Sequence, residues 1–96
     1  MAVVVTAAHA GAYIRTFTVT GALADNGIDS APTNHGLAQA PIAVNIVDTT
    51  AAGSTEGDCW SVHTVGATQF TVRKAVATTQ DRTALVTLYD PHSIDR

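Results

Sequence analysis

The stretch "CWSVHTVGATQFTVRKAV", residues 59 to 76, contains two runs in which β-branched and polar residues alternate. The pair Gly66-Ala67 lies between the two runs. Alternating runs on either side of a short glycine-containing turn are typical of a β-hairpin. Trp60 and Phe70 are the largest apolar side chains of the two arms, and we expect both to anchor a core.

Outward from this hairpin, other short runs of β-branched residues are separated by Gly, Pro, Asn and Asp at intervals of about ten residues. In the run "GAYIRTFTVTG", one face of a strand takes Tyr13, Phe17 and Val19, with Arg15 as the odd member. The other face takes Ile14, Thr16, Thr18 and Thr20. The long loops "ALADNGIDSAP" and "DTTAAGSTEGD" are expected to be exposed, and no stretch favours a helix. The predicted strands are residues 2–8, 11–20, 41–49, 58–65, 68–76 and 82–90. The expected fold is a single antiparallel β-sandwich or flattened barrel of about six to eight strands.

The 96 residues are expected to form one domain, 1–96, with an N-terminal arm at 1–10 and a C-terminal tail at 91–96. A chain of this size buries only about 64% of its surface on folding, so it would gain from a partner. Of the hydrophobic residues 17 are alanine, which bury little area, and only 14% of all residues are charged, against about 25% in typical domains. A surface so poor in charge indicates that part of it is covered by another chain, and we expect a homo-oligomer.

Charge and cysteine content bear on the class of function. The formal net charge of −3 argues against a nucleic-acid partner, because phosphate binding requires clustered Lys and Arg. The single cysteine, Cys59, excludes an internal disulfide and favours synthesis in a reducing cytoplasm. The N-terminal run lacks the basic segment of a signal peptide, and no apolar stretch approaches the roughly 20 residues of a membrane span. We therefore expect no membrane partner.

His35 lies in "TNHGLAQAP", residues 33 to 41, where it could be a metal ligand or a residue of a structural corner. Asn34 and Gly36 tolerate left-handed backbone, and a proline cannot donate a ladder hydrogen bond, so an irregular corner before a strand explains the segment. The spacing of His35 from the other histidines, His9, His63 and His92, matches no zinc signature. We predict a structural role for His35, with no metal and no cofactor.

A nucleophilic site would take Ser61 or Cys59 as nucleophile, His63 as base and an aspartate such as Asp58. In a strand, Ser61 and His63 are about 7 Å apart along the chain, and no glycine elbow exposes the hydroxyl. Cys59 is more typical of a small buried apolar residue than of a reactive thiol. We therefore predict no catalytic residue and no enzyme activity.

Residue type alone would allow a calcium site or a sugar-binding face. Loop carboxylates could gather around calcium, but their spacing fits no EF-hand loop, and solvated turns are the favoured interpretation for Asp25, Asp29, Asp48, Glu56 and Asp58. Three aromatic rings could stack on a sugar, namely Tyr13, Trp60 and Tyr89. Because the chain has few aromatic residues, we expect them to be used in the core instead.

Residues 1 to 8 contain the consecutive valines Val3, Val4 and Val5. Consecutive apolar residues place side chains on both faces of a strand, and a lone terminal strand cannot bury both. The three valines are therefore the predicted contacts with a neighbouring chain.

Three segments, "NHGLAQAPIAVNIV", "GDCWSVHTVGATQFTVRKAV" and "TALVTLYDP", resemble small β-rich virion proteins of tailed bacteriophages. The resemblance covers roughly residues 25 to 90 and implies a head decoration (cement) protein or a fibre or tail module, usually a homotrimer without enzyme activity. It implies synthesis in the host cytoplasm, location in the virion, and binding to the major capsid protein or a tail component by edge-strand pairing and apolar burial. The alternative function is a receptor- or glycan-binding fibre module that recognises its target through loops 21–40 and 49–58.

Overall fold

The computed structural model describes residues 3–50 and 57–91. Their secondary structure is almost entirely β, since the one described helix is a single 3-10 turn, η1. The elements are β1 (Val4–Ala10), β2 (Ile14–Gly21), β3 (Ile28–Asp29), β4 (Thr33–Asn34), β5 (Ala43–Asp48), η1 (Gly57–Cys59), β6 (Trp60–Val65), β7 (Gln69–Lys74) and β8 (Arg82–Tyr89).

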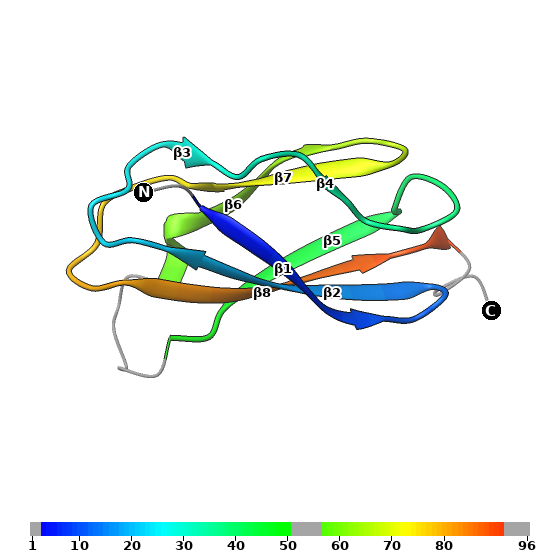
Figure 1. Cartoon of the computed structure of the whole chain (residues 1–96), viewed down its shortest axis with the longest axis horizontal. Coiled ribbons are helices and arrows are strands. Elements are labelled where there is room, and N and C mark those ends of the chain that lie inside the picture. Colours follow the sequence, from blue (N-terminus) through cyan, green and yellow to red (C-terminus); the bar gives the residue numbers. More distant parts are fainter. Residues whose placement is uncertain (1–2, 51–56, 92–96) are drawn as a thin grey trace.

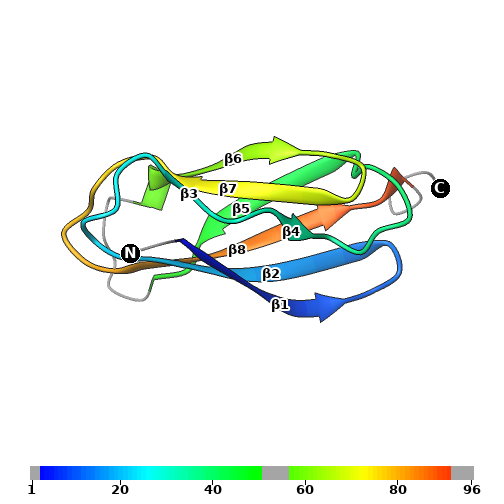
Figure 2. The ribbon, with the colours of Figure 1, turned by 45° about the horizontal axis from the view of Figure 1, so that its top comes forward.

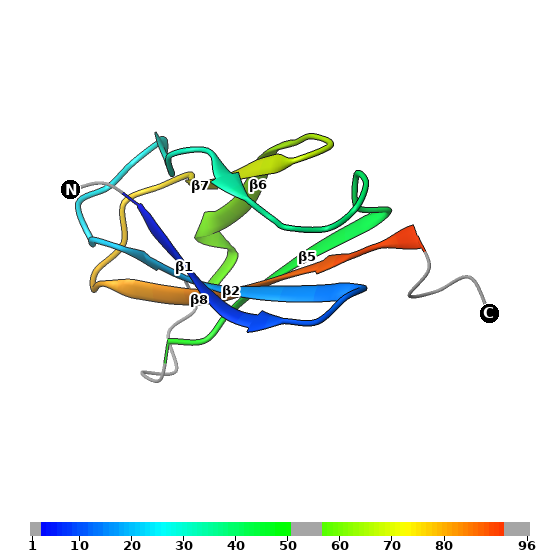
Figure 3. The ribbon, with the colours of Figure 1, turned by 45° about the vertical axis from the view of Figure 1, so that its right-hand side comes forward.

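The strands form two layers, here called sheet A and sheet B (Figure 1). Sheet A has the strand order β1-β2-β8-β5. In sheet B, β7 pairs with β6 on one side and with the short strands β3 and β4 on the other. All these pairs are antiparallel, and Figures 2 and 3 show the same two layers from other directions. The structure is therefore the antiparallel β-sandwich that the sequence predicted, and not a closed barrel.

The core lies between the layers because residues of one parity on each long strand point inward. In β8 the buried residues Ala84, Val86 and Leu88 alternate with residues that are exposed or half-buried. Phe17 of sheet A meets Phe70 of sheet B with ring centroids 5.0 Å apart and planes at 60°, a tilted pair of the kind that stabilises by about 0.5–1.5 kcal/mol beyond area burial.

The hairpin prediction is confirmed, because β6 and β7 pair directly around a turn in which the Gly66 amide donates to the Gln69 carbonyl at 2.8 Å. Trp60 and Phe70 are both buried, as predicted. The other four predicted strands also exist, with ends that differ from the prediction by at most three residues. Alternation along the chain was therefore sufficient to find every long strand.

The prediction of a long exposed loop over "ALADNGIDSAP" is correct for seven of its eleven residues, which are exposed, and wrong for the rest. Part of this loop forms β3, which pairs with the C-terminal half of β7. Two other residues of the loop, Asp25 and Ser30, are buried. Ser30 donates its amide to the Val72 carbonyl at 2.7 Å, and its hydroxyl oxygen accepts the Val72 amide at 3.0 Å. The loop pairs with an edge of β7 whose backbone amides and carbonyls would otherwise lack hydrogen-bond partners. The local sequence of the loop does not reveal this pairing.

Candidate functional site

His35 is completely buried, with 0% exposure, at the corner between β4 and β5. Its Nδ1 accepts the Leu37 amide at 3.1 Å, so its Nε2 carries the proton and donates to the Gly66 carbonyl at 3.0 Å. Gly36 has a φ of 77°, the left-handed geometry expected for this corner. The ring joins the corner to the β6–β7 turn, and neither ring nitrogen keeps a free lone pair for a metal.

The other histidines lie apart from His35. His9 is on β1 beside a bulge, and His92 lies outside the described residues. His63 is on the exposed face of sheet B, with Nε2 3.3 Å from Arg73 Nη2 and 3.5 Å from Asp29 Oδ2. Across residues 3–50 and 57–91, no three His, Cys, Asp or Glu side chains form a group that could hold a metal ion.

The residues considered for nucleophilic catalysis do not assemble into a site. Cys59 is buried, and burial raises the pKa of its thiol. Ser61 is exposed and lies opposite Arg73 in the β6–β7 register, while Asp58 is exposed in the 3-10 turn. Within the described ranges no hydrogen bond joins His63 to either Ser61 or Cys59, so His63 activates neither as a nucleophile in this structure.

The solvated-turn interpretation of the carboxylates is wrong for two of them. Asp25 is buried, and one of its carboxylate oxygens accepts the Ala22 amide at 3.1 Å. Asp48 is nearly buried as well, with 9% side-chain exposure. Asp29 is exposed but pairs with Arg73 at 2.6 Å, and the hydrogen bond from Arg73 lowers the pKa of Asp29. Asp58 is exposed, and Glu56 lies outside the described residues.

A polar cluster that the sequence interpretation missed is built around Arg82 at one end of the sandwich. The Arg82 side chain is 1% exposed, and its Nε and Nη2 donate to the Asp48 carboxylate at 3.1 and 2.9 Å. Trp60 Nε1 and the Thr50 amide donate to the same carboxylate, both at 2.9 Å. Burial pushes the pKa of Asp48 up, but the hydrogen bonds from Arg82, Thr50 and Trp60 outweigh it and hold this pKa below its usual value.

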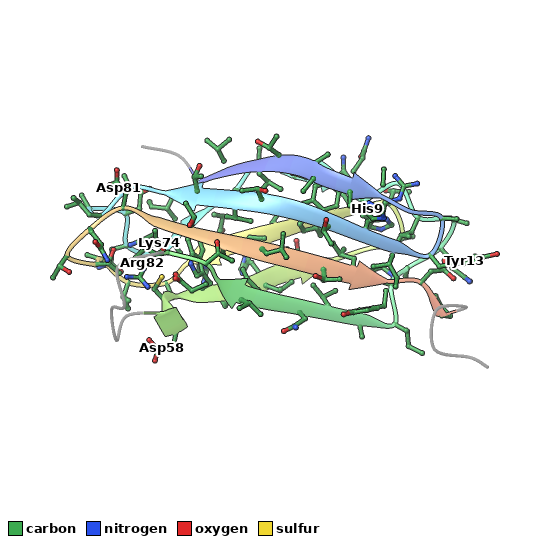
Figure 4. The ribbon with its side chains drawn as sticks, turned by 90° about the horizontal axis from the view of Figure 1, so that it is seen from below. His9, Tyr13, Asp58, Lys74, Asp81 and Arg82 are labelled. Carbon is green, nitrogen blue, oxygen red and sulfur yellow. The ribbon has the colours of Figure 1, made fainter. Side chains whose placement is uncertain are left out.

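The signal for this cluster was the parity of β8, because Arg82 has the same inward orientation as Ala84 and Val86. Lys74 of β7 is likewise fully buried, and its Nζ donates to the carbonyls of Asp25 at 3.1 Å and Val76 at 2.7 Å. Figure 4 shows Lys74 and Arg82 at the same end of the molecule. Both cations are bound to protein groups inside the fold, so we assign them a structural role.

The three aromatic rings considered for sugar binding are not brought together. Trp60 packs near Gly21, at the end of β2, where its ring would contact an added Cβ at 3.0 Å. Tyr89 lies opposite Ile14, at the start of β2, and Tyr13 precedes that residue. Trp60 is thus at one end of the eight-residue strand β2, and Tyr13 and Tyr89 are at the other end.

The valines predicted to contact another chain take three different positions. Residues 4 to 10 form strand β1, which pairs along its length with β2 as the edge of sheet A. Val3 is buried in the core with 3% exposure, and Val5 packs against that core. Val4 points the other way and is 53% exposed. Within β1 only Val5 is half-buried and the other residues are exposed, so Val4 is the valine with the most side chain available for a contact with another chain.

Beside Val4, the outward-pointing residues of sheet A form a surface that we call the outer face. Figure 4 views the molecule from the side of this sheet. Register and burial place fourteen residues on it, of which none is Asp, Glu, Lys or Arg and one is a histidine: Val4, Thr6, His9, Ile14, Thr16, Thr18, Thr20, Ala43, Asn45, Val47, Thr83, Leu85, Thr87 and Tyr89.

The outer face is mostly threonine and aliphatic. Its exposed large apolar side chains include Val4 at 53%, Val47 at 52% and Leu85 at 37% exposure. A hollow of ≈310 Å³ lies at one end of the sheet, with Val4, Thr20 and Thr83 in its lining. The exposed Asp81 and the buried Arg82 also line it, so a charged side chain stands at the margin of the outer face. Nothing in the described chain covers this face, which makes it the surface best suited to an interaction.

No known protein family, no curated protein and no solved structure matches this chain. The described residues contain no helix long and apolar enough to cross a membrane. The class of protein that the structure defines is an all-β sandwich with one neutral, uncovered sheet face.

Proposed function

We propose that this protein is a structural component of a virus particle, a capsid decoration (cement) protein that binds the major capsid lattice and stabilises it. The observation that supports the proposal is the outer face of sheet A, which lacks charged side chains and carries exposed Val4, Val47 and Leu85. Contiguous exposed apolar and neutral surface on a small domain is typical of sites that bind another protein.

The contact with the lattice would be made by β1. This strand is an edge of sheet A, and it pairs on one side only, with β2. An edge strand offers unpaired amides and carbonyls to a strand of another protein. No lysine, arginine or proline lies on that edge between Val4 and Ala10, and the bulge between Ala7 and His9 leaves the residues from Val4 to Ala7 as its regular part. We therefore propose strand pairing through β1, with Val4 buried at the seam.

The protein would have no enzyme activity, would be made in the host cytoplasm and would reside in the virion. It would act as a homo-oligomer, since a domain of this size buries only about 64% of its chain surface by itself. The resemblance to decoration proteins implies three copies, whereas two-fold pairs are the commonest arrangement among soluble homo-oligomers. A glycan-binding fibre module is less favoured, because Trp60 lies at the opposite end of β2 from Tyr13 and Tyr89, and the three rings do not form one stacking platform among the described residues.

The direct test is to determine whether the chain is part of the virus particles made in cells that express it from its native genome. Particles are purified through a density gradient, and the chain is sought in head and tail fractions by mass spectrometry and then located by particle reconstruction. Sedimentation with heads, and a lower melting temperature of heads that lack the chain, would support the decoration role. A chain that stays entirely in the soluble fraction would refute the virion role.

The part played by β1 is tested with Val4→Lys. A lysine at an edge strand disfavours pairing with another strand, so this variant should bind heads at least about tenfold more weakly, a change that corresponds to about 1.4 kcal/mol. Val76→Lys is the matched control, because Val76 is 51% exposed against 53% for Val4 and lies outside the strands. Equal binding by the two variants would contradict a contact through β1.

A further inference from the structure

We propose that the outer face of sheet A is the contact between two copies of this chain, which pack sheet against sheet about a two-fold axis. The inference concerns the isolated protein, but it uses the same face as the proposed function: where two copies cover the outer face, the capsid lattice would be contacted through the backbone edge of β1. The face is covered by a second copy of the chain, so the assembly is a dimer.

The distribution of charge favours this occupant. The outer face of sheet A has no charged side chain, whereas the opposite surface of the sandwich carries Asp29, Arg73 and His63 in mutual contact. A charged partner would therefore find no opposite charge on sheet A. In a two-fold contact the same patch meets itself, so any charge near the axis would meet a like charge. A neutral face is free of that penalty.

Hydrogen-bonding capacity points to the same occupant. Six of the fourteen residues on the outer face are threonine: Thr6, Thr16, Thr18, Thr20, Thr83 and Thr87. A hydroxyl both donates and accepts, so a threonine face can hydrogen-bond to an identical face without a complementary set of donors. The exposed Val47 and Leu85 are direct partners in the β5–β8 register. They form an apolar patch beside the threonine side chains of the face.

The outer face has the size of a small interface. The four strands of sheet A at about 4.8 Å spacing, and about seven residues at about 3.3 Å rise, span about 19 by 23 Å in plan. This plan area is about 440 Å² per copy, or about 880 Å² for the pair, and the side chains that stand out from the sheet add to the accessible area. Stable interfaces bury about 1,200–2,000 Å² in total, so we expect a dimer that dissociates on dilution.

Stacked sheets also leave the remaining surface available. Two sheets pack face to face at about 10 Å, with strand directions about 30° apart. The backbone edge of β1 lies at the side of such a pair, so the pair remains compatible with strand pairing through β1. The contact itself needs no change in the fold of either copy.

The test compares lysine substitutions on and off the face in multi-angle light scattering and sedimentation equilibrium across a hundredfold dilution. We expect two protomer masses for the wild type at the high concentration. Val47→Lys should raise the dimer dissociation constant about tenfold or more, because the symmetric contact receives two unpaired charges. Val65→Lys is the control, since both valines lie on edge strands and are similarly exposed, 52% for Val47 and 42% for Val65.

A second variant, Leu85→Lys, tests the same face from a central strand, and each variant is first shown to melt cooperatively. One protomer mass at every wild-type concentration would overturn the proposal, and three masses would overturn the two-fold arrangement. A dimer weakened equally by Val65→Lys and Val47→Lys, or unaffected by both Val47→Lys and Leu85→Lys, would also overturn it. Selective weakening by the two substitutions on the outer face would support it.

Discussion

Asp48→Ala is expected to be among the most destabilising substitutions outside the apolar core. It removes the carboxylate that accepts two hydrogen bonds from the buried Arg82 guanidinium and one from Trp60 Nε1. Arg82 Nη1 already has no hydrogen-bond partner among the described residues. The variant would therefore contain a buried cation without its counter-ion.

The size of the effect follows from the burial of the pair, at 1% side-chain exposure for Arg82 and 9% for Asp48. Removing one partner of a buried ion pair costs about 3–5 kcal/mol, out of a total stability of about 5–15 kcal/mol for a typical domain. For a chain of this length, 3 kcal/mol lowers the melting temperature by at least about 12 °C. Asp48→Ala should thus lose a large part of its cooperative stability.

Removing both charges distinguishes an unpaired cation from a lost contact. Replacing a buried ion pair by apolar side chains is often neutral, so Asp48→Ala/Arg82→Met should be about 2 kcal/mol more stable than Asp48→Ala alone. The assay is urea unfolding followed by the fluorescence of Trp60, the only tryptophan. Asp29→Ala, which breaks an exposed ion pair, is the control and should change the midpoint little. If the double variant were less stable than Asp48→Ala, the account of Arg82 as an unpaired buried cation would be wrong.

Three further outcomes are expected. Gly21→Ala should lower the free energy of unfolding by about 1–3 kcal/mol, because its Cβ would lie 2.9 Å from Cδ of the buried Lys74; thermal melting should show little change for Gly66→Ala, where the nearest atom is 3.5 Å away. The lowered pKa of Asp48 stabilises the fold above the unfolded-state pKa of about 3.9, and this stabilisation is lost as pH falls through the lower folded-state pKa. The decline in midpoint below about pH 4 should therefore be shallower in Asp48→Asn, and an identical decline would contradict this role. Cys59, buried with a raised thiol pKa, should react with a thiol reagent only as fast as the protein unfolds, and rapid labelling of the native protein would contradict its burial.

The sequence by itself determined the long strands, because their signal is local. Alternation along β7 and β8 specifies which residues share a face, and it correctly placed Trp60 and Phe70 in the core. The corner at His35 was equally local, since Asn34 and Gly36 are neighbours in the chain. Such features depend on contacts within a few residues, so they are readable without knowing which strands pair.

Only the tertiary structure decided which strands lie beside one another. Alternation says that Arg82 and Ala84 point the same way, but not that β5 lies next to β8 and provides Asp48, 34 residues away, as counter-ion. It also could not order β3, which forms because β7 has an edge to satisfy. The neutral outer face has the same origin, since residues from four separate strands become one surface only after β1, β2, β8 and β5 are assembled in register. Strand partners are chosen by long-range burial and hydrogen bonding, which short-range periodicity does not encode.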